Sequence, residues 1–527
     1  MITKTSDIRN SEVGQLVVFI GLLFIVRFLF LCISPLELSP DEAYYWDWSR
    51  RLSWGYYSKP PMVAWLMALS TSIFPVSEFA VRFPAVLLNV LTALVIYLTG
   101  RKMAGHRTGL RASLAYSATI GAAVAGFIMT IDAPLLCFWA LTIFFLWLAI
   151  EKSLKEKSQS SSFLWIISGI FCGLGLLSKQ TMIALSSATV IFFLSTSHGR
   201  KFLGQIGPYL FYGFQFLLLL PFLWWNYNHN WITFIHTAHH FEQAEKTTLF
   251  RIDTFWELLG TQAGLITPLL YVVLIASALC IMISLFIRAR HLVYEPKKLL
   301  SVTILLISGL FPLLLVFLLS FKQRINANWP APFYISLSLL LGLWLDGFFA
   351  EGQGKYCQRI KSLFRPAVTT GLILVTTLYT LPFVFAYTSL SGSSLDPTVR
   401  LRGWRQLAHE ADSLLSSVPT NNKTIVVARR RQTVSELAFY MKGHPVVYRW
   451  NGFERRIKSQ YELWPTPLNK IGWDALVIAD ANKGLDGLSQ CFRSFSLLKQ
   501  INIDLGSGRK RVFNVYLGQE LLKWAHR

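Results

Sequence analysis

The chain has 527 residues, of which 53% are hydrophobic and only 15% are charged, and its mean hydropathy is +0.45. Soluble globular proteins carry about a quarter charged residues, so this composition excludes an ordinary soluble enzyme. The formal net charge is +22, but in a membrane protein excess Lys and Arg mark cytoplasmic loops and contacts with anionic lipid. We therefore predict a polytopic α-helical membrane protein whose partners include membrane lipids and no nucleic acid.

Apolar runs of about 20 residues recur along the first 390 residues, and each is long enough to cross a hydrocarbon layer of about 30 Å. The first run is followed by no small-residue cleavage pattern before Pro35, so we interpret it as a retained helix and not as a signal peptide. The pattern predicts about eleven spans, at residues 14–33, 80–100, 108–128, 131–150, 163–178, 180–196, 205–225, 264–287, 299–320, 331–349 and 368–388.

The orientation follows from the positive charges between these spans. Lys and Arg are concentrated in the N-terminal segment and in every second loop after it, which places those segments in the cytoplasm. An odd number of spans puts the tail on the outer side. There, short β-like runs such as TIVVA and DALVIAD alternate with helix-like stretches. We predict a transmembrane domain over residues 1–390 and an extracytoplasmic α/β domain over residues 391–527.

The first outer loop, residues 34–79, contains the stretch SPDEAYYWDWSRRLSWGYYSKPP from Ser39 to Pro61. Its adjacent carboxylates, aromatic cluster and Lys-Pro-Pro are more than a connection between two helices requires. One interpretation is structural: Asp41 and Glu42 cap a helix that begins at Pro40, and the Trp and Tyr residues form an interfacial belt. The other interpretation is a functional site.

Further polar residues fall on the same predicted face of the membrane. Ionisable side chains at membrane depth are costly, and their gathering at one face favours a site there. The competing interpretations are that Arg82 and Lys179 extend to lipid headgroups and that the histidines form an interfacial polar face. The residues are Arg82, Asp132, Lys179, His236, His239, His240, Lys322, Arg324, Asn328 and Trp329.

The order of these motifs resembles that of the bacterial GT-C glycosyltransferases, and more narrowly the relatives of protein O-mannosyltransferases and the aminoarabinose–lipid A transferases. The Asp-Glu pair, the Lys-Pro, SEFAVRFPA before the second span and an aspartate at the start of the fourth span occur in this order. LLSKQT and INANWPAP are also similar to segments of the bacterial branch. The resemblance covers about residues 10 to 390. It implies a GT-C fold and transfer of a sugar, with inversion, from a polyprenyl-phosphate donor to lipid A or lipopolysaccharide, another glycan or a protein.

The resemblance also implies roles for individual residues. Asp41, with its neighbour Glu42, and Asp132 match catalytic carboxylates, and a carboxylate can serve as the base for a hydroxyl acceptor. If the acceptor is a phosphate, no base is needed and Asp41 would orient it. Cations stabilise a phosphate leaving group, so the expected donor-phosphate ligands are Lys59, Arg82 and Lys179. The expected substrate contacts are Tyr57, Lys322, Arg324, Asn328 and Trp329.

A divalent metal ion is the one cofactor that the resemblance suggests, with His239 and His240 as candidate ligands. Ser58 stands where the aminoarabinose branch has a glutamate partner for the metal, which separates this chain from that branch. The resemblance further suggests a bacterial inner membrane, with the N-terminus cytoplasmic and the C-terminal domain periplasmic.

Two other classes compete with the enzyme. A transporter or flippase for a polyprenyl-linked or amphipathic substrate would need ionisable residues near the midplane and paired, broken helices. A membrane scaffold would leave Asp41, Lys59 and Asp132 unexplained. In the tail, the run Arg429–Arg431 is interpreted as a solvated basic surface, with attraction of anionic lipid or lipopolysaccharide as the functional alternative.

Overall fold

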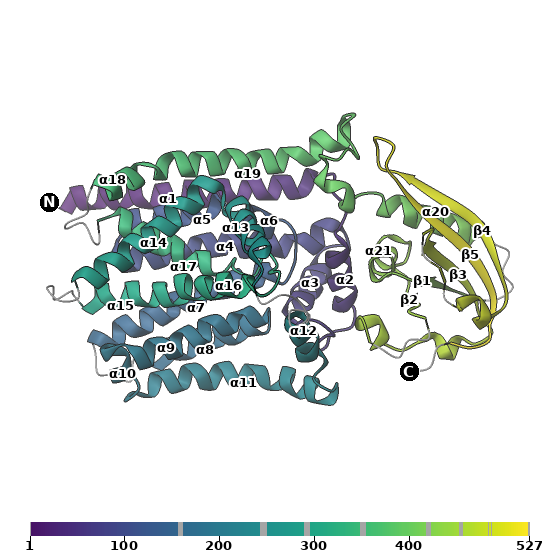
Figure 1. The fold of residues 1–527 in the computed structure, drawn as a ribbon, viewed down its shortest axis with the longest axis horizontal. Helices are drawn as coiled ribbons and strands as arrows, with labels where there is room; N and C mark the ends of the chain where they lie inside the picture. The colour runs from purple at the N-terminus through teal and green to yellow at the C-terminus, as the bar shows by residue number, and fades with distance from the viewer. Residues whose placement is uncertain are drawn as a thin grey trace. The chain divides into compact units, whose positions relative to one another are not determined.

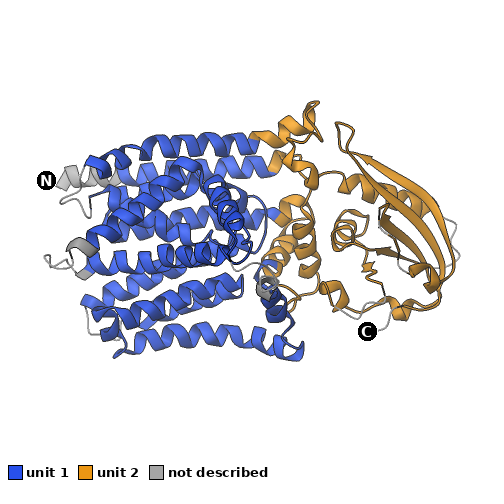
Figure 2. Cartoon of the chain, viewed as in Figure 1, with its two compact units in different colours: residues 1–31, 59–63, 82–379 blue, residues 32–58, 64–81, 380–527 orange. Residues whose placement is uncertain are grey.

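The structure is a computed structural model that describes residues 2–155, 162–242, 250–288, 296–347, 355–417, 423–452, 457–482, 484–485 and 487–524. The chain forms two compact units, coloured separately in Figure 2. We call residues 1–31, 59–63 and 82–379 the membrane unit, and residues 32–58, 64–81 and 380–527 the sheet unit. The sheet unit therefore combines most of the first predicted loop with the C-terminal tail.

The described residues contain seven helices that are long and apolar enough to cross a membrane, which confirms the predicted polytopic helical protein. They are α1 (Ile2–Ile33), α4 (Glu78–Ala104), α7 (Asp132–Lys155), α11 (Ile206–Asn228), α14 (Pro268–Arg288), the continuous pair α15 and α16 (Pro296–Leu305 and Phe311–Ser320), and α18 with α19 (Lys355–Ser362 and Phe364–Tyr387). Four shorter apolar helices are α3 (Met62–Ile73), α8 (Ser162–Leu176), α9 (Ile183–Ser195) with the turn before it, and α17 (Phe333–Leu345). The exact number of eleven spans remains a prediction.

Two predicted spans are interrupted. The span expected at residues 108–128 consists of α5 (His106–Ser117) and α6 (Ile120–Ala125), because the Thr119 side chain accepts the Ala122 N–H and starts a new helix. A π-helical turn at Leu306–Leu310 joins α15 to α16. The remaining helices of the membrane unit are α10 (Ser197–Phe202), α12 (Ile232–Glu242) and α13 (Ile252–Ile266).

The core of the membrane unit is built by close helix packing, and Figure 1 shows α7, α8 and α11 running alongside one another. Trp139 and Trp147 of α7 and Trp165 of α8 are fully buried there. Gly169 of α8 lies so close to α11 that an added Cβ would stand 2.3 Å from the Phe211 carbonyl oxygen. A small residue at this contact lets the two backbones approach, as is common between membrane helices.

The sheet unit contains a five-stranded mixed sheet in the order β2-β1-β3-β5-β4. Strand β1 pairs in parallel with β2 and β3, whereas β5 pairs antiparallel with β3 and β4. The strands are β1 (Thr424–Ala428), β2 (Val447–Arg449), β3 (Asp474–Asp480), β4 (Phe492–Asp504) and β5 (Lys510–Leu521). The helices are α2 (Pro40–Ser49), most of α3, α20 (Trp404–Ser417) and α21 (Arg431–Tyr440). This confirms a C-terminal α/β fold.

The topology brings chain segments together at the carboxyl ends of the parallel strands. Residues 429–431 follow β1 directly and lead into α21, and residues 450–451 follow β2. The chain leaves β1 toward β2 on one side and returns to β3 on the other. In open α/β sheets, ligands bind outside the carboxyl ends of strands near such a reversal.

Candidate active site

Three of the predicted site residues meet in the membrane unit at the first residue of α7. Asp132 accepts a hydrogen bond at Oδ1 from Lys179 Nζ, at 2.7 Å. Its other oxygen, Oδ2, accepts one from Asn328 Nδ2, also at 2.7 Å. We call these three residues the Asp132 cluster. They come from three separate segments of the chain, since Asp132 begins α7, Lys179 follows α8 and Asn328 precedes α17.

Within the Asp132 cluster, the ion pair of Asp132 and Lys179 is largely shielded from solvent, whereas Asn328 is exposed. The side chain of Lys179 is 6% exposed and that of Asp132 is 14% exposed. A buried ion pair is retained only when the geometry and the remaining hydrogen bonds compensate for desolvation. Because both Asp132 oxygens are engaged, the geometry suits this carboxylate to holding Lys179 and Asn328 in place.

Lys59 lies in the same unit, on the segment next to the Lys179 hairpin. The Met62 N–H donates to the Leu177 carbonyl oxygen at 3.0 Å, which fixes residues 59–63 beside residues 177–179. Pro60 and Pro61 follow Lys59, and a residue before proline is restricted to extended backbone. Two lysines predicted to bind the donor phosphate thus reside on adjacent segments.

Arg82 is buried at 1% exposure in α4. Its guanidinium carbon lies 4.5 Å from the ring centroid of Phe127, on the segment that leads into Asp132. A cation over an aromatic face is attracted by the ring quadrupole. The buried position is not that of a side chain extending to lipid headgroups, which was the competing interpretation of Arg82.

The Asp-Glu pair opens α2 in the sheet unit, and its two carboxylates differ. Glu42 is fully buried, and its Oε2 accepts the Ser39 backbone N–H at 2.9 Å, while Ser39 Oγ accepts the Glu42 N–H. This reciprocal capping box starts the helix, with Pro40 at its first position. The structural interpretation, in which a carboxylate caps the helix that begins at Pro40, therefore applies to Glu42.

Asp41 has another environment, because its side chain is 57% exposed. Its Oδ1 accepts a hydrogen bond from Arg431 Nη2 at 2.8 Å, from the first residue of α21. The Arg431 guanidinium also lies 4.6 Å from the ring centroid of Tyr44. Arg431 thus orients a carboxylate that remains exposed to solvent. The sequence analysis missed this residue, having grouped Arg429–Arg431 as a solvated surface.

A third carboxylate of the first loop, Asp47, was not predicted. It is buried in α2, and its Oδ1 accepts from Arg50 Nη1 at 3.2 Å. Burial raises the pKa of Asp47 above its ordinary value, although Arg50 and Arg51 act in the opposite direction. Arg50 in turn donates to the His444 carbonyl oxygen at 2.7 Å, so this pair anchors α2 to the end of α21.

The expected substrate contacts are distributed over both units. In the sheet unit, the Tyr57 N–H donates to Gln460 Oε1 at 2.7 Å. In the membrane unit, Arg324 pairs with Glu257, and Lys322 is exposed beside it. Trp329 is half-buried next to Asn328, which alone of this set belongs to the Asp132 cluster.

The candidate metal ligands lie on α12. His236 and His239 are on the described part of this helix, whereas the side chain of His240 lies outside the described residues. Among the side chains that the structure describes, no three His, Cys, Asp or Glu residues gather closely enough to hold a metal ion. We therefore derive no chemical step through a metal.

The arrangement of helices defines the class of fold. Superposition on the crystal structure of ArnT from Cupriavidus metallidurans covers 96% of this chain and 98% of ArnT, with a TM-score of 0.61 and 15% sequence identity. The oligosaccharyltransferase of Archaeoglobus fulgidus superposes with a TM-score of 0.51, over 87% of this chain and 68% of the other. The chain thus has the predicted GT-C-type fold.

Sequence comparison narrows the resemblance. The chain is 24% identical to the lipid A galacturonosyltransferase RgtD of Rhizobium johnstonii, over 80% of this chain and 82% of RgtD. It is 30% identical to an undecaprenyl phosphate-α-4-amino-4-deoxy-L-arabinose arabinosyl transferase of Proteus mirabilis, over 37% of this chain and 36% of the relative. Residues 58–225 match the family model described as dolichyl-phosphate-mannose-protein mannosyltransferase. The predicted resemblance to the bacterial GT-C glycosyltransferases is confirmed.

Proposed function

We propose that this chain is an integral membrane glycosyltransferase of a bacterial inner membrane. It moves a sugar from a polyprenyl-phosphate donor to lipid A or a related glycolipid, with inversion at the anomeric carbon. The observation that carries the proposal is the similarity to RgtD, which extends over about four fifths of both chains and includes both units. An ArnT structure with bound undecaprenyl phosphate supports a polyprenyl carrier for this fold.

The residue roles follow from the chemistry of the transfer. The bond between the anomeric carbon and the phosphate oxygen breaks, and negative charge develops on the departing polyprenyl phosphate. Lys59 binds that phosphate, with Lys179 beside it, because preorganised cations stabilise a developing anion. Asp132 positions Lys179 and Asn328 and does not itself transfer a proton. Asp41, oriented by Arg431, takes the proton of an acceptor hydroxyl as the new glycosidic bond forms, or orients a phosphate acceptor.

The sugar is a hexose derivative in this proposal. The relative matched over four fifths of its length is named as a galacturonosyltransferase, and Ser58 departs from the aminoarabinose branch. The N-terminus faces the cytoplasm and the sheet unit faces the periplasm, in agreement with the distribution of Lys and Arg. A divalent metal at His239 and His240 remains a prediction.

The test is transfer of labelled sugar in proteoliposomes from undecaprenyl phosphate carrying galacturonic acid, mannose or 4-amino-4-deoxyarabinose, with lipid A as the acceptor. We expect transfer from a hexose donor, and loss of at least a hundredfold in rate for Asp41→Asn with donor binding retained. Lys59→Ala should instead weaken donor binding. Transfer from the aminoarabinose donor alone would refute the hexose assignment. No transfer from any donor, with unchanged lipid A modification in cells carrying Asp41→Asn, would favour the transporter.

A further inference from the structure

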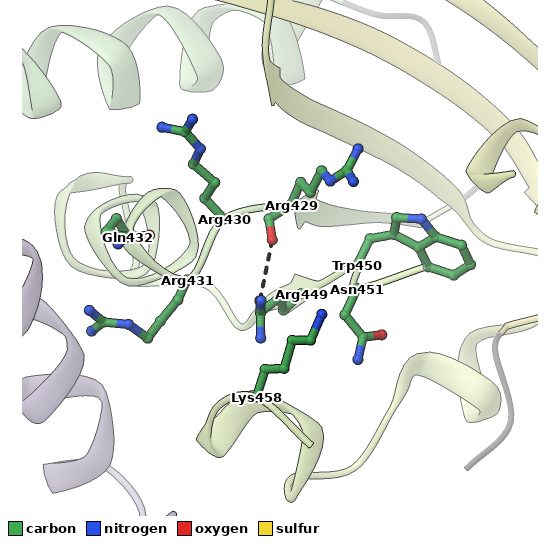
Figure 3. A pocket seen from close by; sticks show the side chains of 8 residues that line it. All are labelled: Arg429, Arg430, Arg431, Gln432, Arg449, Trp450, Asn451 and Lys458. Atoms are coloured by element: carbon green, nitrogen blue, oxygen red, sulfur yellow. Dashed lines mark hydrogen bonds between the residues drawn. The ribbon is translucent and has the colours of Figure 1, made fainter. Parts of the chain in front are cut away.

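The sheet unit contains a strongly basic cavity whose lining residues, apart from Arg431, have no role in the proposed reaction. Its volume is about 360 Å³, and Figure 3 shows the side chains that line it. They are Arg429, Arg430, Arg431, Gln432, Arg449, Trp450, Asn451 and Lys458. Five of these eight residues are cations and none is a carboxylate. We call this the basic cavity.

The position of the basic cavity is set by the sheet topology. Arg429 to Arg431 follow β1, and Trp450 follows β2, so the cavity lies at the carboxyl ends of two adjacent parallel strands. The link between the two segments is direct: Arg449 Nε donates to the Arg429 carbonyl oxygen at 3.3 Å. This edge is where open α/β sheets bind ligands.

Carboxylates outside the cavity hold three of its arginines in fixed positions. Arg430 pairs with Asp480 at 3.0 Å, Arg431 with Asp41 at 2.8 Å, and Arg449 with Glu462 at 2.6 Å. Glu462 also accepts the backbone N–H of Lys458, which ties that residue to Arg449. Among the residues that the structure describes, these carboxylates do not line the cavity, and they fix the directions of the three guanidinium groups. Preorganised guanidinium groups suit phosphate oxygens.

The first turn of α21 adds to the same field. The helix has ten residues, and Arg430 at its N-cap makes no side-chain capping hydrogen bond. Gln432, in the first turn, lines the cavity. The N-terminus of a helix carries partial positive charge and unpaired N–H groups, which favour an anion. The N-terminus of α21 and the basic side chains of the cavity therefore both favour a bound anion.

We propose that the basic cavity binds a phosphate group, and that this group belongs to the phosphorylated headgroup of the glycolipid acceptor. The volume falls within the range of about 300–1,000 Å³ typical of small-molecule sites, which accommodates a sugar phosphate and not only a bare ion. Asn451 adds an amide to the lining, which can hydrogen-bond to a sugar hydroxyl. The identification of the headgroup as acceptor rests on the proposed function. The phosphate chemistry rests on the cavity alone.

The experiment uses the full-length chain in neutral phosphatidylcholine nanodiscs at fixed ionic strength. Binding is measured for purified lipid A, for the same lipid A with its phosphates removed, and for inorganic pyrophosphate. The test variant is Arg429→Gln/Lys458→Gln, because both residues line the basic cavity and neither has a role in the proposed transfer step. We expect the variant to bind phosphorylated lipid A at least tenfold more weakly than the wild type, and dephosphorylated lipid A to bind weakly to both.

A matched control removes the same charge from the opposite end of β1. Lys423 precedes that strand, and Lys423 and Lys470 both lie over the Trp473 ring, away from the residues that line the cavity. Lys423→Gln/Lys470→Gln should bind phosphorylated lipid A within twofold of the wild type. The charge-preserving variant Arg429→Lys/Lys458→Arg should bind phosphorylated lipid A as the wild type does. That result would show that the Gln variant loses binding because the charges are missing and not because it is misfolded.

Each outcome decides a separate point. Equal binding of the two lipid A forms, or an equal loss in the control pair, would overturn the phosphate site. Pyrophosphate binding as tightly as lipid A, with the same dependence on Arg429 and Lys458, would support a phosphate site but assign it to a free anion. Phosphate-dependent binding without any sugar transfer would refute the proposed function and leave the phosphate site standing. Sugar transfer at the wild-type rate in Arg429→Gln/Lys458→Gln would refute only the assignment of the bound phosphate to the acceptor headgroup.

Discussion

The Asp132 cluster of the membrane unit and the basic cavity of the sheet unit differ in the burial and the balance of their charges. In the cluster, one lysine meets one carboxylate, and both side chains are mostly buried. Around the cavity, Arg430 is 45% exposed and Lys458 is exposed, and five of the eight described lining residues are cations.

The difference follows from the surroundings. Away from water an unmatched charge is expensive, so charges there are paired and act as fixed parts of the structure. Near water an excess of one sign costs little, and its field can attract a ligand of the opposite sign. The same residue types therefore support geometry in one unit and recognition in the other, and this contrast can be tested.

The largest effect is expected from breaking the buried pair. Lys179→Ala leaves Asp132 with an uncompensated charge, and we expect a loss of about 3–5 kcal/mol of stability together with loss of sugar transfer. The measurement is thermal unfolding in detergent micelles. The double variant Asp132→Asn/Lys179→Met should recover most of the stability without recovering transfer. Equal instability of the single and double variants would contradict the pairing.

The second effect concerns Arg431, which holds Asp41 in the sheet unit. Arg431→Gln removes a charge-assisted hydrogen bond, a loss of about 1.5–3 kcal/mol, so the transfer rate should fall by about 10- to 100-fold. The donor is bound elsewhere in the proposal, so its KM should change little. Arg431→Lys should restore part of the rate. An unchanged rate in Arg431→Gln would show that Asp41 needs no support from Arg431.

A third prediction uses pH. Desolvation raises the pKa of Asp396, but hydrogen bonds from Thr398 and the Gly392 N–H, with the charge of Arg402, lower it more, so the net shift is downward. A depressed pKa contributes stability that is present above the ordinary value of 3.8 and is lost as the pH falls through the folded value. The difference in unfolding temperature between wild type and Asp396→Asn should therefore shrink as the pH is lowered from 6 to 3. A difference that stays constant over this range would contradict the assignment.

The smallest effect is expected at an exposed pair of the membrane unit. Arg324 and Glu257 have side chains that are 75% and 40% exposed. Exposed ion pairs contribute about 0–1 kcal/mol, so Arg324→Gln should change stability by less than that. A loss comparable to that of Lys179→Ala would remove the distinction between buried and exposed charge. A large fall in transfer at unchanged stability would instead support Arg324 as a substrate contact.

The sequence predicted the parts of the fold that have a regular pattern. Strands β1 and β3 coincide with TIVVA and DALVIAD, because buried strands show as short apolar runs. Strand β4 was missed, since most of its residues are exposed or half-buried in FRSFSLLKQINID and give no such run. Helix α21 was missed because three arginines at its start suggested a solvated surface.

The sequence predicted on which face of the membrane the charged residues lie, but not which of them form pairs. The charge pattern placed Asp132 and Lys179 on one face, but 47 residues separate them and the sequence alone does not say which carboxylate meets which lysine. Asp41 and Arg431 are 390 residues apart, and their contact depends on the packing of α2 against α21. Local patterns carry information about single elements, whereas contacts between distant elements are decided by the whole fold.

The composition of the sheet unit has a consequence for how the protein is made. The Leu38 N–H donates to the Tyr440 hydroxyl, and the Tyr44 hydroxyl accepts the Gln460 N–H, across 402 and 416 residues of sequence. At synthesis rates of about 5–20 residues per second, the first loop waits roughly 20–80 s for these partners to be translated. The loop with Asp41 thus emerges among the first segments and is completed among the last. Any chain truncated before α21 carries its candidate base on an unfinished support, and early termination therefore yields an inactive protein and not a partly active one.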